Sequence, residues 1–288
     1  NVVGGQMAAA GSVLLLGGTD GIYKVDLTGS SITQLATAAA GTMVAPYWVK
    51  GRVIASRANV LHQTTLVGGA LDSTSTIYSH PDPAWRWTGV TETPDAILAS
   101  GYSGGTSAIY AFTLIEDSGG SVPKLSQPRT VLELPPGEEV RSIRSYLGAY
   151  VGIGTTAGVR VAIVGQNGQI QTSPVLVQTD DPVITLAARD SFLYAGTGTS
   201  VIRVDLSEAI DDGLRFPYAY DVEVSGSSPV TSLAFDGVSD RVVAGVSGVG
   251  TFAASTTHRV PTGWLLSGAI RYATTVPKAF QKVDITGS

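Results

Sequence analysis

The chain has 288 residues and a formal net charge of −5 at neutral pH, and only 14% of its residues are charged. No run of Lys or Arg could neutralise a line of phosphates and no stretch of about 18 apolar residues occurs, which argues against a nucleic-acid partner and excludes a membrane-spanning helix. Cysteine is absent, which excludes disulfides and thiolate metal sites, and the low charge together with 35 glycines favours a strand-rich chain.

A short pattern recurs six times along the chain. It consists of a hydrophobic run that ends in a small residue, a Gly-rich turn, and a second run in which apolar residues alternate. In chain order, the small residues are Gly17, Ala55, Ala99, Gly152, Ala195 and Ala244, spaced 38, 44, 53, 43 and 49 residues apart. A period of about 40 to 50 residues with several strands in each unit is typical of a β-propeller. The sequence therefore predicts an all-β propeller.

Each repeat has room for four strands, because an apolar stretch precedes each hairpin and another extended run follows it. In the second repeat, strands are expected at 43–49, 52–56, 60–67 and 76–80. In the fifth repeat, they are expected at 183–187, 192–195, 201–206 and 218–224. The small residue at the end of each second strand is expected to let adjacent blades approach one another near the axis.

Six four-stranded blades are the expected arrangement, and seven are the alternative. A seventh blade would have to come from the insert between Ser118 and Pro128, which is rich in Gly, Ser and Pro and too short for four strands. Residues 2–9 are expected to form the first strand of the first blade, although they could instead complete the last one.

No cofactor or metal site is expected. The three histidines, His62, His80 and His258, have no partners at metal-ligand spacing. The chain also lacks a nucleophile elbow in a strand-to-helix setting and a phosphate-binding loop. These features disfavour acyl-transfer and phosphoryl-transfer enzymes.

Paired carboxylates need separate consideration, because a propeller can hold two acids across its channel mouth as a glycosidase does. Four acidic pairs occur beside Gly, Pro or Ser: Glu116-Asp117, Glu138-Glu139, Asp180-Asp181 and Asp211-Asp212. We expect these pairs to be solvated turns, and we assign no catalytic residue. A propeller glycoside hydrolase is the alternative.

One short stretch combines several aromatic and charged side chains. Its members are Tyr78, His80, Asp82, Trp85, Arg86 and Trp87. Aromatic faces stack on sugar rings while Asp and Arg bind hydroxyl groups, so the stretch is a candidate glycan-binding patch. Under the other interpretation, Trp85 and Trp87 share one face of a strand and pack in the core between blades.

The carboxyl-terminal segment carries a more specific pattern. It contains the pattern Gly-x-Ile-Arg-aromatic followed by Thr-x-x-Pro-Lys-x-Phe, at Gly268, Ile270, Arg271, Tyr272, Thr274, Pro277, Lys278 and Phe280. This segment resembles the one that follows the propeller in minor tail proteins of tailed phages infecting actinobacteria. In that family an acidic residue is expected before the proline, where this chain has Val276.

The resemblance implies a tail-tip or baseplate component of the virion. Residues 1–262 would form the propeller, residues 263–288 would lead into a following domain, and the chain would be a piece of a longer polypeptide. Its partners would be other phage tail proteins, in a homo-oligomeric tail assembly, and a glycan of the host cell envelope. We therefore expect a non-enzymatic domain for host recognition or attachment, with a glycan hydrolase or a purely structural spacer as alternatives.

Overall fold

The computed structural model describes residues 7–10, 13–18, 21–25, 31–37, 44–64, 66–67, 70–71, 75–115, 124–165, 168–207, 215–223, 228–236, 238–239 and 241–255. These residues belong almost entirely to one compact unit, Asn1–Ala254. The predicted segment 263–288, with all residues that carry the tail-protein resemblance, lies outside the described residues. The same holds for His258, Glu116-Asp117 and Asp211-Asp212.

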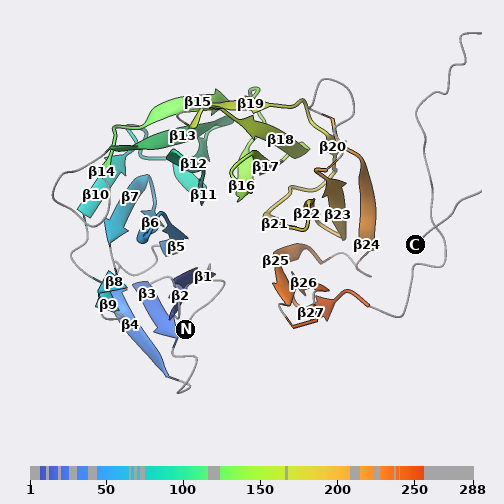
Figure 1. Ribbon diagram of the computed structural model, residues 1–288, viewed down its shortest axis with the longest axis horizontal. Coiled ribbons are helices and arrows are strands. Elements are labelled where there is room, and N and C mark those ends of the chain that lie inside the picture. Colours follow the sequence, from blue (N-terminus) through green and yellow to red (C-terminus); the bar gives the residue numbers. More distant parts are fainter. Residues whose placement is uncertain are drawn as a thin grey trace, which may run out of the picture. The chain divides into compact units, whose positions relative to one another are not determined.

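The strands form six small antiparallel sheets arranged as a six-bladed β-propeller (Figure 1). The first blade contains β1 (Met7–Ala10), β2 (Val13–Gly17), β3 (Gly21–Val25) and β4 (Ile32–Thr37). The second contains β5 (Val44–Val49), β6 (Arg52–Arg57), β7 (Val60–Thr64) and β10 (Ser75–Ser79), with a hairpin of β8 (Leu66–Val67) and β9 (Ala70–Leu71) between its last two strands. The third contains β11 (Arg86–Glu92), β12 (Ala96–Ser103) and β13 (Thr106–Ile115), and both β14 (Lys124–Leu125) and β15 (Arg129–Glu133) pair with β13.

The remaining three blades follow the same order. The fourth contains β16 (Val140–Tyr146), β17 (Tyr150–Thr155) and β18 (Gly158–Val164), and both β19 (Ile170–Thr172) and β20 (Val177–Gln178) pair with β18. The fifth contains β21 (Thr185–Arg189), β22 (Phe192–Gly196), β23 (Ser200–Asp205) and β24 (Tyr218–Glu223). The strands described for the sixth are β25 (Val230–Asp236), β26 (Arg241–Val246) and β27 (Gly250–Ala253).

The first strand of each blade lies toward the centre of the propeller. Strand β5 contacts both β1 and β11, and along the chain β11 contacts β16, β16 contacts β21, and β21 contacts β25 (Figure 1). Repeated backbone bonds join the blades near these strands: the amide of Val183 donates to the carbonyl of Thr155 at 3.0 Å, and that of Val230 donates to the carbonyl of Thr197 at 2.9 Å. The fourth, fifth and sixth blades are thus fixed to one another at the start of their inner strands.

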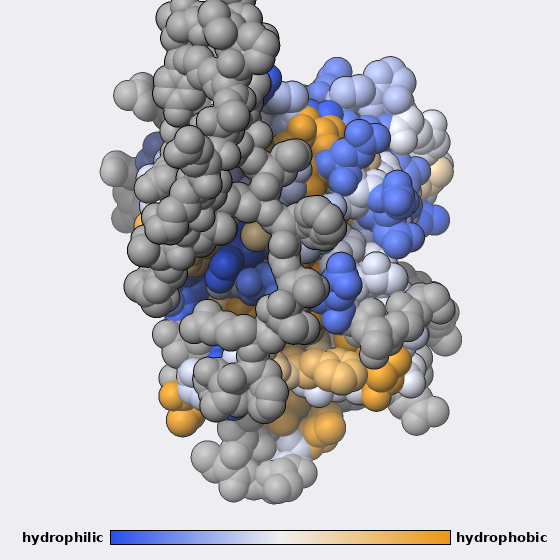
Figure 2. Space-filling view, turned by 90° about the vertical axis from the view of Figure 1, so that its right-hand side faces the viewer, coloured by the Kyte–Doolittle hydropathy of each residue, from blue (hydrophilic) through white to orange (hydrophobic). Residues whose placement is uncertain are grey.

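Apolar side chains fill the space between blades, as period-two alternation predicts. The junction of the fourth and fifth blades, for example, buries Leu193 and Ile202, which are 1% and 0% exposed. Gly152 shows why small residues recur on second strands, because a β-carbon there would lie 2.7 Å from the methyl groups of Leu193. On the sixth blade, Val249 and Phe252 are 55% and 45% exposed. Figure 2 shows apolar surface in the lower part of this side of the molecule, between the residues drawn in grey.

The strands predicted for the second and fifth repeats are confirmed, with ends that differ by at most three residues. The largest difference is at β7, which ends at Thr64 because residues 66–67 turn back into the short hairpin instead. Met7–Ala10 pairs with β2, so this part of the predicted first strand belongs to the first blade. The alternative of seven blades is wrong: the insert ends in β14, which joins the third blade through β13. No helix in the described part of the chain is long and apolar enough to cross a membrane.

Candidate functional site

The six residues of the predicted glycan patch lie together at the junction of the second and third blades. Tyr78 is on β10, His80, Asp82 and Trp85 are in the 80–85 connection between β10 and β11, and Arg86 and Trp87 begin β11. His80 stacks on Trp85 with 4.0 Å between ring centroids and 15° between planes, and Trp85 meets Trp87 edge to face at 5.7 Å. The structure therefore brings the aromatic members into contact.

The two indoles are part of the core. Trp85 and Trp87 are only 3% and 8% exposed, and both pack against Tyr110 of β13. Close packing over Gly101 leaves no free face on Trp85, since a β-carbon at that glycine would lie 2.3 Å from its Nε1. The core-packing interpretation thus holds for both tryptophans, and they do not provide a surface on which a sugar ring could stack. Such aromatic pairs each add about 0.5–1.5 kcal/mol beyond burial, which makes the junction rigid.

The charged members of the patch lie at the surface instead. Asp82 Oδ1 accepts the amide of Ala84 at 2.8 Å, and the Asp82 carbonyl accepts the amide of Trp85 at 3.1 Å, which closes a tight turn. A hydrogen bond with the Ser103 side chain is the main reason why the pKa of Asp82 lies below its usual value. Arg86 is exposed, and its Nη1 donates to the carbonyls of Trp85 at 2.9 Å and Pro83 at 3.3 Å.

Residues of the third and fourth blades extend this charged surface. Tyr102 lies directly opposite Arg86 in the β11–β12 register, so the two side chains share a face. Arg141 of β16 donates from Nη1 to the Tyr102 hydroxyl at 2.9 Å, and its guanidinium carbon lies 4.5 Å from the centre of the Tyr102 ring. Arg141 also forms an ion pair with Glu139, and the two side chains are 31% and 22% exposed.

We refer to Asp82, Arg86, Tyr102, Glu139 and Arg141 as the polar platform. Two of its members, Asp82 and Arg86, were predicted from the sequence as part of the glycan patch. Glu139 was noted there only as half of an acidic pair. Tyr102 and Arg141, which meet although they are 39 residues apart, were not predicted. The repeat could have indicated this contact, because it places the end of the second strand of one blade beside the start of the first strand of the next blade.

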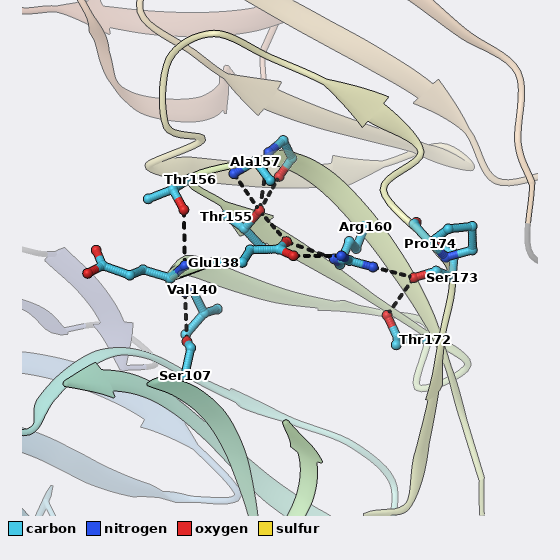
Figure 3. A network of polar contacts seen from close by, with 12 residues as sticks. Ser107, Glu138, Val140, Thr155, Thr156, Ala157, Arg160, Thr172, Ser173 and Pro174 are labelled. Atoms are coloured by element: carbon cyan, nitrogen blue, oxygen red, sulfur yellow. Dashed lines mark hydrogen bonds and ion pairs between the residues drawn. The ribbon is translucent and has the colours of Figure 1, made fainter. Parts of the chain in front are cut away.

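Glu138, the other half of that acidic pair, is not part of a solvated turn. It is 7% exposed and accepts from Arg160 Nε at 2.8 Å and Nη2 at 2.6 Å, while Thr155 Oγ1 donates to it at 2.7 Å (Figure 3). The remaining nitrogen, Arg160 Nη1, donates to the carbonyl of Ser173 at 2.9 Å. Burial opposes ionisation of Glu138, but the bonds from Arg160 and Thr155 outweigh it and hold the pKa below its usual value. The expectation of a solvated turn is therefore wrong for Glu138, because a buried guanidinium compensates its charge.

The other described titratable candidates show no such arrangement. Asp180 and Asp181 are exposed, as expected of a turn. His62 Nδ1 lies 3.3 Å from the hydroxyl of Thr76 on the neighbouring strand. In the described ranges, no three or more His, Asp or Glu side chains are grouped so that they could hold a metal ion.

No protein-family model matches the chain, and no curated protein matches it. Among solved structures, it is similar to the extracellular domain of a one-component system from B. thetaiotaomicron, with a TM-score of 0.64 and 16% identity over 88% of this chain and 32% of that one. It is also similar to the computationally designed Ika8 protein (TM-score 0.58, 15% identity, 86% of this chain and 69% of that one) and to a chain of the mitotic checkpoint complex (0.57, 14%, 85% and 72%). The chain thus spans about a third of the B. thetaiotaomicron chain. At these identities the likeness shows the propeller fold alone.

Proposed function

We propose that this chain is a non-enzymatic tail-tip domain of a phage minor tail protein, which contributes to host attachment by binding saccharide of the cell envelope. The tail assignment is supported by the sequence resemblance of residues 268–280 to tail proteins of actinobacteriophages. It implies a place in the virion, beside other tail proteins and further copies of the same chain. The saccharide assignment is supported by one observation, the polar platform across the third and fourth blades.

The chemistry of the platform suits sugar hydroxyl groups. Asp82 provides acceptor oxygens, Arg86 provides donors in a planar fork, and the half-buried ring of Tyr102 provides an apolar surface between charged groups. The Arg86 guanidinium is held by backbone carbonyls, and the connection that supplies them is anchored by the buried indoles. A site whose side chains are already ordered loses less conformational entropy when a ligand binds.

The environments of Asp82 and Glu138 support binding over hydrolysis. A glycosidase needs a general acid whose pKa is raised, opposite a second carboxylate. Asp82 and Glu138 have lowered pKa values, and the Glu138 carboxylate is bound by Arg160 and Thr155. Glu139 forms an ion pair with the guanidinium of Arg141.

The test is an assay of the purified chain with envelope glycans from a panel of actinobacteria, in which bound protein and released sugar fragments are both measured. We expect saturable binding without release. Arg86→Ala should weaken binding by at least tenfold, while the control Arg215→Ala, at an exposed arginine of the fifth blade, should not change it. Fragment release that Glu139→Gln abolishes would overturn the proposal in favour of a hydrolase. Absence of both binding and release would favour a structural spacer.

A further inference from the structure

His80 links three segments of the propeller. Its backbone amide donates to the carbonyl of Asn59 at 2.9 Å, and Asn59 Nδ2 donates to the carbonyl of His80 at 2.7 Å, so its main chain is tied to the β6–β7 turn of the second blade. Its ring reaches the third blade, where Nε2 lies 3.0 Å from the Tyr110 hydroxyl. The remaining nitrogen, Nδ1, accepts the amide of Asp82 at 3.1 Å.

These contacts define the protonation state of the ring. A backbone amide can only donate, so Nδ1 holds a lone pair in this geometry. The neutral imidazole therefore carries its proton on Nε2, which donates to the oxygen of Tyr110. Burial lowers the pKa of His80, and Asp82, through its main chain and its carboxylate, offsets only part of this effect, so the ring is neutral at pH 7.

We propose that His80 is a pH-sensitive latch for the 80–85 connection: protonation at Nδ1 removes the acceptor of the Asp82 amide and releases the turn that carries Asp82 and whose carbonyls hold Arg86. A protonated Nδ1 is a hydrogen-bond donor, and so is the Asp82 amide. The two groups could therefore no longer form a hydrogen bond with each other. The amide would then have to move to reach solvent or another acceptor, because a partly buried donor left without an acceptor costs free energy.

The charged and titratable groups around the His80 ring determine how easily it is protonated. The titratable and charged groups around it are Asp82 in the connection, Arg86 on β11, Tyr78 on β10, and Tyr110 on β13 with Glu133 of β15 beyond it. Tyr78 and Tyr110 stay neutral, since burial raises the pKa of each phenol. Asp82 is therefore the anion that favours a charged ring, and it sits on the segment that must move.

Release of the turn would reach the platform through short contacts. The turn is closed by the bond from the Trp85 amide to the Asp82 carbonyl, and Arg86 Nη1 is held by the carbonyls of Pro83 and Trp85. Movement of these carbonyls moves the guanidinium. The release itself depends only on His80 and its contacts, whereas a change in saccharide affinity also rests on the proposed function.

Amide hydrogen exchange at Asp82 tests the latch without any ligand. Exchange is followed by NMR between about pH 7.5 and about pH 4.5, after correction for the intrinsic pH dependence. We expect protection of the Asp82 amide to fall by about fivefold, the value of one ordinary hydrogen bond, as the His80 ring titrates. His80→Gln, which cannot titrate, should abolish the pH dependence. The control His62→Gln, at the other histidine of the second blade, should retain it.

Two results would overturn the latch. One is a wild-type Asp82 amide whose protection does not change while the His80 resonances titrate, and this result decides the matter even if His80→Gln fails to fold. The other is an equal change in His80→Gln. Glycan binding at both pH values then separates the two proposals. Loss of affinity at low pH in the wild type but not in His80→Gln supports coupling, and failure to bind at either pH refutes the proposed function while leaving the exchange result valid.

Discussion

The ion pair between Glu138 and Arg160 allows a quantitative prediction from the structure. Replacing Arg160 by Met removes two bonds to the carboxylate and one to the Ser173 carbonyl, and leaves Glu138 buried with the bond from Thr155. A charge-assisted bond contributes about 1.5–3 kcal/mol, and removing one partner of a buried pair costs about 3–5 kcal/mol. We therefore expect Arg160→Met to lower the free energy of unfolding by about 3–5 kcal/mol at pH 7.

The assay is urea unfolding followed by tryptophan fluorescence. Removing both charges with Glu138→Met and Arg160→Met together should restore part of the loss, because no charge is then left unpaired. A control is Arg203→Met, which breaks a pair with Asp221 at 3.5 Å whose side chains are 40% and 25% exposed. Exposed pairs contribute about 0–1 kcal/mol, so this variant should remain close to the wild type.

The contribution of the Glu138–Arg160 pair to stability depends on pH, and the direction of this dependence follows from the pKa of Glu138. In the wild type the pKa of Glu138 is lowered, so the pair contributes stability above the ordinary glutamate pKa and loses it as pH falls through the folded value. Without Arg160, only the bond from Thr155 opposes the effect of burial, which raises the pKa of Glu138, so the difference in stability between Arg160→Met and the wild type should shrink on acidification. A cost below about 1 kcal/mol at pH 7, or a double variant less stable than Arg160→Met, would refute this reasoning.

Two further predictions concern packing and pH. Gly152→Val places a side chain against Leu193, with the β-carbon 2.7 Å from its methyl groups, and should lower the free energy of unfolding by about 1–3 kcal/mol in a thermal melt. The control Gly165→Ala, where the nearest atom is 3.5 Å from the added β-carbon, should lower it by less than about 1 kcal/mol. Equal losses of stability in the two variants would refute the packing argument. Burial lowers the pKa of both His62 and His80, so the unfolded chain binds protons first and stability should decline as pH falls below about 6.5. Replacing both histidines by Gln should flatten this part of the stability profile, and an unchanged profile would contradict it.

The propeller could be predicted because its information is local. A blade is a run of short strands joined by tight turns, and the small residue at a fixed phase reflects packing that recurs in every blade, as Gly152 against Leu193 illustrates. Period-two alternation also raised core packing of Trp85 and Trp87 as the alternative to the glycan patch, and their burial agrees with that alternative. Both features can be read within a window of about ten residues.

The polar contacts of the candidate site and its surroundings could not be predicted in the same way, because they join residues that are far apart in the sequence. The guanidinium that neutralises Glu138 lies 22 residues later, and Arg141 meets Tyr102 across 39 residues. Neither sequence separation falls within a single strand or helix. Glu138 and Glu139 therefore looked alike in the sequence, although one is buried against Arg160 and the other pairs with Arg141 at the surface.

The most direct test of the central claim locates the bound saccharide. Hydrogen exchange of the chain is compared with and without an envelope glycan that binds it, at a pH near 7.5 where His80 is neutral. Binding at the polar platform predicts new protection in the 80–85 connection, at the end of β12 around Tyr102, and at the start of β16 around Arg141. Protection confined to other blades would contradict the assignment of the platform as the saccharide site.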